Sequence, residues 1–129
     1  MIAVDTNVLV RLVTADDEGQ TRRATALFER EEVFLCKTVL LETEWVLRFS
    51  YGLDGPAILR ALRGVAGLPG VTVEDAPAVV LAFALMEDGV DFADALHLAS
   101  ARKAAGFATF ARRLARHAAV AEEGWVLEV

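Results

Sequence analysis

The first twelve residues, MIAVDTNVLVRL (1–12), decide the fold class. Residues 2–4 are apolar and β-prone, and they are few enough to form one buried strand. Asp5 follows directly, and the apolar spacing after it predicts a helix over residues 6–13. The sequence therefore places a carboxylate at the carboxyl end of a strand, where open α/β sheets bind ligands. Asp5 is explained equally well as the N-cap of the helix, because Asp is favoured at that position.

Strands and helices alternate along the rest of the chain. Further strands are predicted at residues 33–36, 71–73, 107–110 and 125–127. Helices are predicted at residues 20–31, 38–51 with Thr38 as N-cap, 56–65, 75–88, 91–106 and 112–118. This alternation predicts an α/β fold with a mostly parallel central sheet and helices on both faces. Since no linker or repeat interrupts it, we expect one domain over residues 1–129.

Length and composition indicate a globular protein. The chain has 129 residues, 55% hydrophobic and 25% charged, which suits a domain with a sizeable core. The single cysteine, Cys36, excludes an internal disulfide and fits a reducing compartment, and its apolar neighbours predict a buried strand residue. No secretory signal is evident, and the longest uncharged run, residues 76–86, is too short to span a bilayer. We therefore expect a cytoplasmic protein without a membrane partner.

The charge distribution is uneven. A net charge of −6 argues against a globally basic nucleic-acid binder. Residues 95–121, however, contain no acidic side chain and carry several arginines, among them Arg112, Arg113 and Arg116. Two interpretations stay open for this interval: a solvated basic face, or a surface that contacts phosphates beside an acidic pocket.

The second candidate carboxylate is Glu42, in the helix predicted over 38–51. Glu42 shares one helical face with three residues expected in the core: Trp45, Val46 and Phe49. A buried carboxylate needs a cation or strong donors, so this placement favours a functional role. The alternative is that Glu42 lies at the edge of the stripe and bends to solvent. Glu44 faces elsewhere and is expected to form an ordinary surface pair with Arg48.

The third candidate site is GVDFADALHLASARKA, residues 89–104. Asp91 is the expected N-cap of a helix, and Asp94 follows one turn later on the same face. Asp94 faces the same side as His97 and Leu98, toward the body of the protein, which suits a site residue. His97 has no second histidine at ligand spacing, so it is better explained as a hydrogen-bonded residue at the edge of the core than as a metal ligand.

Asp5, Glu42 and Asp94 together indicate a metal site. Two carboxylates about 4 Å apart repel by roughly 4 kcal/mol at an effective dielectric near 20, so the chain must protonate them, separate them or neutralise them with a cation. Oxygen ligands without a Cys/His set favour Mg²⁺ or Mn²⁺. Such ions bind phosphate oxygens and activate water, so an acidic pocket beside a basic strip predicts phosphodiester cleavage.

Four segments, taken in order, resemble one known family: DTNVLVRL (5–12), TVLLETEWVLR (38–48), DFADALHLA (91–99) and TFARRLAR (109–116). They are similar to the PIN-domain ribonucleases, specifically the VapC-type toxins of toxin–antitoxin pairs. The resemblance implies a three-layer α/β/α sandwich and a Mg²⁺- or Mn²⁺-dependent endoribonuclease that cuts RNA. It also implies a homodimer that is inhibited by a cognate antitoxin protein.

The resemblance also implies roles for particular residues. The family's acidic positions fall on Asp5, Glu42 and Asp94, and Asp91 matches a commonly acidic neighbour that could also hold the metal. Thr6 and Asn7 match the turn that would orient Asp5. Arg112, Arg113 and Arg116 are expected to approach the RNA backbone.

One position departs from the family pattern. Ala111 stands where the family usually has an aspartate, so a fourth carboxylate is missing and full activity is in question. This leaves an alternative: a degenerate PIN domain that binds RNA and antitoxin with little or no cleavage. A third reading, a phosphohydrolase or phosphoacceptor of another α/β family, ranks last because neither a DxD after the first strand nor a phosphate-binding glycine loop is present.

Overall fold

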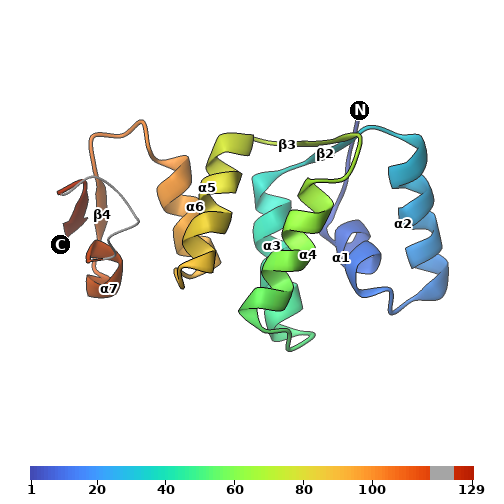
Figure 1. Cartoon of the computed structure of the whole chain (residues 1–129), viewed down its shortest axis with the longest axis horizontal. Helices are drawn as coiled ribbons and strands as arrows, with labels where there is room; N and C mark the ends of the chain where they lie inside the picture. The colour runs from blue at the N-terminus through green and yellow to red at the C-terminus, as the bar shows by residue number, and fades with distance from the viewer. Residues whose placement is uncertain (117–123) are drawn as a thin grey trace. The chain divides into compact units, whose positions relative to one another are not determined.

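Helices and strands alternate along residues 1–116 and 124–129, the part of the chain that the computed structural model describes (Figure 1). They fall into two compact units, Met1–Ala76 (unit 1) and Pro77–Val129 (unit 2). The predicted α/β class is confirmed, because both units contain parallel strands joined through helices, in agreement with a three-layer α/β/α sandwich. The single domain stays a prediction.

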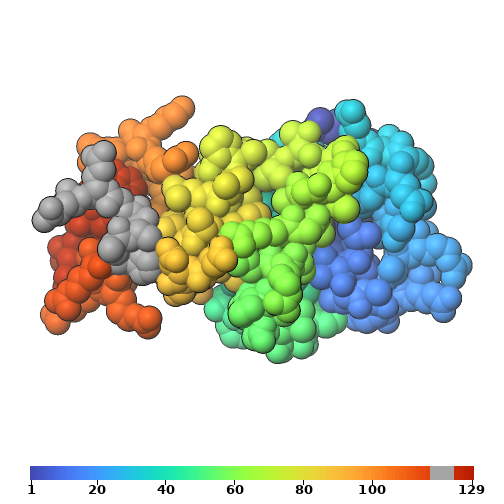
Figure 2. All heavy atoms as spheres, viewed as in Figure 1, coloured from blue at the N-terminus to red at the C-terminus, as the bar shows by residue number. Residues whose placement is uncertain are grey.

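Unit 1 is built on a parallel sheet with the strand order β1-β2-β3. Its elements, in chain order, are β1 (Ile2–Ala3), α1 (Thr6–Thr14), α2 (Glu18–Arg30), β2 (Val33–Leu35), α3 (Lys37–Phe49), α4 (Gly55–Ala66) and β3 (Val71–Val73). Helix α1 packs against both α2 and α3, and α3 packs against α4. In the space-filling view, α2 in light blue lies against α1 in darker blue (Figure 2).

The first strand is shorter and more exposed than its sequence predicts. Ile2 is 43% exposed, and only Val4, just past β1, is buried. The buried strand of this sheet is β2, where Val33 and Leu35 are fully covered. The difference has a topological reason: β2 has a neighbour on each side, whereas β1 pairs with β2 alone at one edge of this three-stranded sheet.

The N-cap of helix α3 lies two residues earlier than predicted, so Thr38 is not the N-cap. The N-cap is Cys36, which is half-buried just after β2 and whose side chain forms no capping hydrogen bond. Instead, Oε1 of Glu74 accepts a 2.8 Å hydrogen bond from the Lys37 N–H. A carboxylate from a distant loop thus does what the local Thr38 hydroxyl was expected to do.

Unit 2 contains two helices followed by a pair of parallel strands. Its described elements are α5 (Ala76–Glu87), α6 (Phe92–Ser100), β4 (Phe107–Thr109), α7 (Arg112–Ala115) and β5 (Val126–Glu128). The rings of Phe83 and Phe92 stack at 6.0 Å between α5 and α6. Part of the predicted helix over 112–118, including residues 117 and 118, lies outside the described residues.

Helix α6 ends at Ser100, six residues before the Gly106 that was expected to terminate it. Residues 102–105 are all exposed, so they bury no apolar face that would hold another helical turn. The carbonyl of Ala104 is used instead by Trp125, whose indole N–H donates to it at 3.0 Å. The segment after Ser100 therefore does not continue the helix, and its Ala104 carbonyl accepts a hydrogen bond from Trp125, the residue before β5.

None of the helices in the described ranges is both long enough and apolar enough to cross a bilayer.

Candidate functional site

Thr6 connects two of the predicted site residues, Asp5 and Glu42, in unit 1. Asp5 caps α1 from an extended backbone, and its Oδ1 accepts a 2.8 Å hydrogen bond from the Thr6 N–H. The Thr6 hydroxyl donates to Oε1 of Glu42 on α3, 36 residues further along the chain. Thr6 is 5% exposed, whereas both carboxylates are exposed. We call these three residues the Asp5–Thr6–Glu42 cluster.

Local sequence and helix packing together explain the cluster. Asp is a preferred N-cap, so Asp5 stays at the start of α1. The next residue, Thr6, is buried where α1 packs against α3. A buried hydroxyl requires a partner, and Glu42 provides an acceptor. A threonine directly after the capping aspartate therefore links the two helices.

The donor set of this cluster fits a hard divalent cation. Both carboxylates are exposed, and in the described part of the chain neither forms an ion pair with a basic side chain. Oδ1 of Asp5 and Oε1 of Glu42 each accept one hydrogen bond, which leaves a second oxygen on each carboxylate for an ion. Oxygen ligands of this kind are what Mg²⁺ and Mn²⁺ prefer.

The buried face of α3 is not the one predicted. Its buried residues are Leu40, Thr43, Glu44 and Leu47. Trp45 and Phe49 are instead 55% and 62% exposed, with their rings 5.2 Å apart, and Glu42 is exposed on the same side. The prediction treated large apolar side chains as core residues, but large apolar side chains also occur on protein surfaces. The alternative reading, that Glu42 reaches solvent, is the correct one.

Glu44 was expected at the surface and is instead 2% exposed. Its predicted pairing with Arg48 does occur, with Oε1 2.7 Å from Nη2. Arg48 is partly exposed and also lies 4.9 Å from the centre of the Phe49 ring. Sequence reasoning missed this buried carboxylate, although Leu40 and Leu47 at helical spacing from it mark the buried face.

Unit 2 holds the other two predicted acidic residues. Asp91 caps α6, as predicted, and its Oδ2 accepts a long hydrogen bond of 3.5 Å from the Asp94 N–H. Asp94 is half-buried in the first turn of α6, and Leu98 on the same face is buried. Asp91 is exposed, and so is His97, which was expected at the edge of the core; its neighbours Leu96 and Leu98 are the buried ones.

The structure thus places Asp5 with Glu42 in one unit, and Asp91 with Asp94 in the other. Within the described residues of each unit, no group of three or more His, Cys, Asp or Glu side chains is close enough together to hold a metal ion. The convergence of Asp5, Glu42 and Asp94 on one ion stays a prediction.

The predicted RNA-contacting arginines lie on and beside α7. Arg113 and Arg116 are exposed, and Arg112 pairs with Glu128 of β5 at 3.0 Å. Ala111 is the N-cap of α7 and provides no side-chain hydrogen bond to it; its own N–H donates to the Thr109 hydroxyl at 3.0 Å. The position where the family usually has a carboxylate is therefore exposed and apolar at the start of a basic helix.

Arg11 and Asp16 form a polar network with Tyr51 at the far end of α1. Arg11 Nη1 lies 2.9 Å from both Oδ1 of Asp16 and the Tyr51 hydroxyl, and that hydroxyl donates to Oδ2 of Asp16 at 2.6 Å. The Tyr51 hydrogen bond is the main cause that lowers the pKa of Asp16, and Arg11 adds to it. Desolvation lowers the pKa of Arg11, but Asp16 and Tyr51 together outweigh it and leave that pKa raised.

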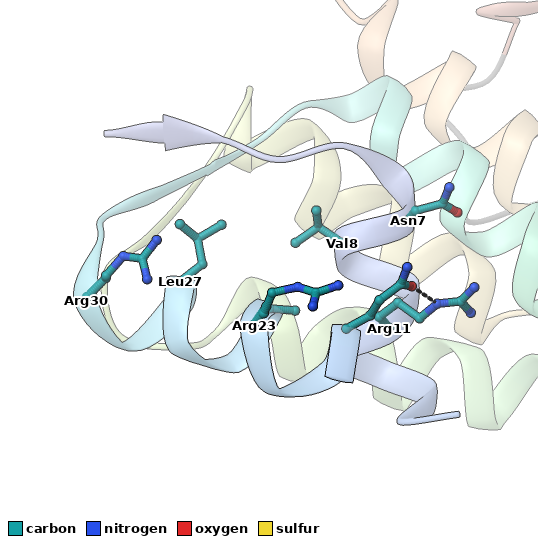
Figure 3. Close-up of a pocket in the computed structure, with 8 residues that line it drawn as sticks. Asn7, Val8, Arg11, Arg23, Leu27 and Arg30 are labelled. Atoms are coloured by element: carbon teal, nitrogen blue, oxygen red, sulfur yellow. Dashed lines mark hydrogen bonds between the residues drawn. The ribbon is translucent and has the colours of Figure 1, made fainter. Parts of the chain in front are cut away.

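Sequence reasoning did not find the pocket between α1 and α2. It has a volume of about 340 Å³ and is lined by Asn7, Val8, Arg11, Gln20, Arg23, Ala24, Leu27 and Arg30 (Figure 3). A usable signal was present, because Arg23 and Arg30 are seven residues apart and therefore share one face of α2.

Comparison with known proteins identifies a family. The family described as PIN domain matches residues 2–120 of the chain. No curated protein and no solved structure matches. PIN domains are generally metal-dependent nucleases, so the match supports the nuclease class predicted from the sequence.

Proposed function

The chain belongs to the PIN domain family, and we propose that it is an endoribonuclease dependent on Mg²⁺ or Mn²⁺. We further propose that it is the VapC-type toxin of a toxin–antitoxin pair and acts in the cytoplasm. The observation that carries the nuclease proposal is the Asp5–Thr6–Glu42 cluster, in which a buried threonine bonds both to the carboxylate that caps α1 and to an exposed carboxylate near the middle of α3.

The proposed metal ligands are Asp5, Glu42 and Asp94, with Asp91 as a fourth candidate ligand. A bound Mg²⁺ or Mn²⁺ would neutralise charge on the phosphate and lower the pKa of a coordinated water. Asp5 is held by the Thr6 N–H and Glu42 by the Thr6 hydroxyl, so the free oxygens of both carboxylates are fixed in direction. Such outer hydrogen bonds orient ligands and raise metal affinity. Asn7 follows as the exposed end of the same turn.

Arg113 and Arg116 are the proposed contacts to the RNA backbone, because both are exposed on the basic segment. Arg112 is held by Glu128, so it contributes less free charge than the other two. If phosphates are neutralised by these arginines, RNA affinity falls as salt rises.

We propose two protein partners, a second copy of the chain and a cognate antitoxin. The exposed ring pair of Trp45 and Phe49 supports association, since large aromatic side chains are enriched at protein interfaces and these two are adjacent. The homodimer is tested by sedimentation of the wild-type chain and of a Trp45→Ala, Phe49→Ala variant. A monomeric wild-type chain would contradict it.

The nuclease proposal is tested by RNA cleavage in Mn²⁺ together with calorimetric Mn²⁺ titration. Asp5→Asn and Glu42→Gln are expected to lose cleavage and to bind Mn²⁺ more weakly, with an unchanged circular dichroism spectrum. Glu29→Gln removes an exposed carboxylate of α2 outside the cluster and is the matched control. Unchanged Mn²⁺ affinity in both cluster variants would refute the metal site.

A second candidate function rests on Ala111. An exposed alanine at the start of α7 cannot bind a metal ion, which favours a chain that binds RNA and antitoxin with little turnover. The variant Ala111→Asp distinguishes the two candidates. If the wild-type chain is inactive in Mn²⁺ and Ala111→Asp cleaves RNA, the binding module is correct; if both cleave, the nuclease is.

A further inference from the structure

We propose that the pocket between α1 and α2 binds one nucleotide of single-stranded RNA, with Arg23 and Arg30 contacting the phosphates on its two sides. This inference rests on the proposed function, since the ligand is the RNA substrate. It adds a second RNA-binding site, on unit 1, to the one proposed at the arginines of α7. Figure 3 shows side chains of α1 and α2 on the two sides of this pocket, which we call the arginine pocket.

The arginine pocket has an excess of positive charge. Three of its eight lining residues are arginines, and none is acidic. Arg11 is already balanced by Asp16 at 2.9 Å. Arg23 is exposed and has no ion-pair partner among the residues that the structure describes. Arg30 is 3.9 Å from Glu31, with both side chains well exposed, so that pair is weak. Two guanidinium groups are therefore available in a chain with a net charge of −6.

The rest of the lining fits a base and sugar better than it fits an inorganic anion. Val8, Ala24 and Leu27 form an apolar surface between the polar groups. A volume of about 340 Å³ lies at the lower end of the range of about 300 to 1,000 Å³ for small-molecule sites. Gln20 accepts a hydrogen bond from Arg11 Nε through Oε1 at 2.6 Å, which leaves its NH₂ group as a donor. Amide groups of this kind can bond to base edges.

The position of the pocket favours RNA over other anions. Asn7 lines the arginine pocket and lies two residues after Asp5, directly beyond Thr6 in α1. The pocket therefore begins next to the Asp5–Thr6–Glu42 cluster, within the same unit. A strand whose phosphate lies at the cluster would place a neighbouring nucleotide at Asn7 and Val8. An acidic peptide could also pair with Arg23 and Arg30, but this continuity with the carboxylate cluster favours the RNA strand.

The test measures RNA binding without cleavage. A 5′-labelled single-stranded RNA of mixed sequence is titrated in EDTA, with fluorescence anisotropy as the readout. The double variant Arg23→Gln, Arg30→Gln is expected to raise Kd about tenfold, and to reduce the slope of log K against log salt by about 0.7 for each lost phosphate contact. The variant Arg23→Lys, Arg30→Lys keeps the charge and is expected to retain most of the affinity.

The matched control is Arg22→Gln with Arg60→Gln, which removes the same charge from exposed positions outside the pocket. Less than a twofold change in Kd is expected for this control. Equal weakening in both double variants would overturn the proposal, because it would show a general charge effect. Wild-type affinity in the Arg23→Gln, Arg30→Gln variant would overturn it as well.

Two further measurements separate this proposal from the nuclease and from a peptide ligand. If the wild-type chain cleaves RNA in Mn²⁺ while the pocket variant binds RNA normally, the pocket fails and the nuclease stands. If RNA binding depends on the pocket but no cleavage occurs, the pocket stands and the nuclease fails. A glutamate-rich peptide that binds the wild-type chain more tightly than RNA, and loses affinity in the pocket variant, would assign the site to an acidic protein segment and overturn the proposal.

Discussion

Two aspartates, Asp5 and Asp91, cap helices in the two units and differ in what lies beside them. Asp5 accepts a 2.8 Å bond from Thr6, and the Thr6 side chain continues to Glu42 on another helix. Asp91 accepts a 3.5 Å bond from Asp94, on the helix that it caps. A capping carboxylate thus becomes part of a wider candidate site where the residue next to it forms a hydrogen bond to a distant helix. Capping alone is a local property of the helix.

The largest effect is expected in a test of whether carboxylates of the two units bind the same metal ion. Asp5→Asn and Asp94→Asn are each expected to reduce Mn²⁺-dependent cleavage by about 100-fold or more, because each removes a proposed ligand. If both hold the same ion, the double variant loses little beyond the worse single variant, since residues that act as a unit are non-additive. Losses that multiply in kcat/KM would show that the two acidic pairs act independently.

The next largest effect is a loss of stability at Glu44, the buried glutamate of α3. Arg48→Met removes a cation that pairs with buried Glu44 and is expected to lower the free energy of unfolding by about 2 kcal/mol, because the buried carboxylate loses this ion pair. Urea denaturation measures this loss. Arg22→Met, which breaks an exposed pair with Glu18, is the control and should change stability by less than about 0.5 kcal/mol. Equal losses of stability in the two variants would show that the buried Glu44–Arg48 pair stabilises the fold no more than the exposed Glu18–Arg22 pair does.

Thr6→Val tests the hydrogen bond that links Glu42 to the residue beside Asp5. The substitution keeps the shape of the side chain and removes the hydroxyl that donates to Glu42. We expect Mn²⁺ affinity to fall about tenfold, the lower end for loss of a ligand-orienting hydrogen bond. Calorimetry measures this affinity. Thr25→Val, on α2, is the control. An Mn²⁺ affinity unchanged by Thr6→Val would show that the Thr6–Glu42 hydrogen bond does not contribute to metal binding.

A smaller effect is expected at the helix that has no side-chain cap. Ala111→Asn provides a capping oxygen at the start of α7, where the backbone is extended with φ −80°. The free energy of unfolding should rise by about 0.5 to 1 kcal/mol. Thermal denaturation measures the gain, and Ala111→Asp gives a second capping residue with charge. If neither substitution raises the free energy of unfolding, the missing side-chain cap of α7 does not lower the stability of the protein.

The smallest effect is on the pH dependence of stability. The pKa of Asp16 lies below the ordinary value of 3.8, mainly through the Tyr51 hydrogen bond, so this carboxylate stabilises the fold above pH 3.8. That contribution is lost as pH falls through the folded-state pKa. Tyr51→Phe should raise the pKa of Asp16 toward 3.8, as measured by NMR titration of its carboxyl carbon. A pKa unchanged by the substitution would mean that Arg11 and Thr14 suffice.

Much of the secondary structure was predictable because its signals are local. The caps Asp5 and Asp91 and the strand at 71–73 follow from residues within a few positions of each element, whereas the start of α3 depends on distant Glu74. The face of α3 was predicted wrongly because the choice between Glu42 and Glu44 depends on which side contacts α1 and α4. The end of α6 was also missed, because the strand pair uses the Ala104 carbonyl.

By itself, the sequence determined that carboxylates stand at the starts of two helices, that an α/β chain with parallel strands forms, and that the positive charge gathers near residues 95–121. Helix packing, in contrast, places the Thr6 hydroxyl where it donates to Glu42, buries Glu44, and makes Arg23 and Arg30 line a pocket with α1. The physical reason is range. Capping and helical period act over a few residues, whereas burial and pairing depend on which helices pack together.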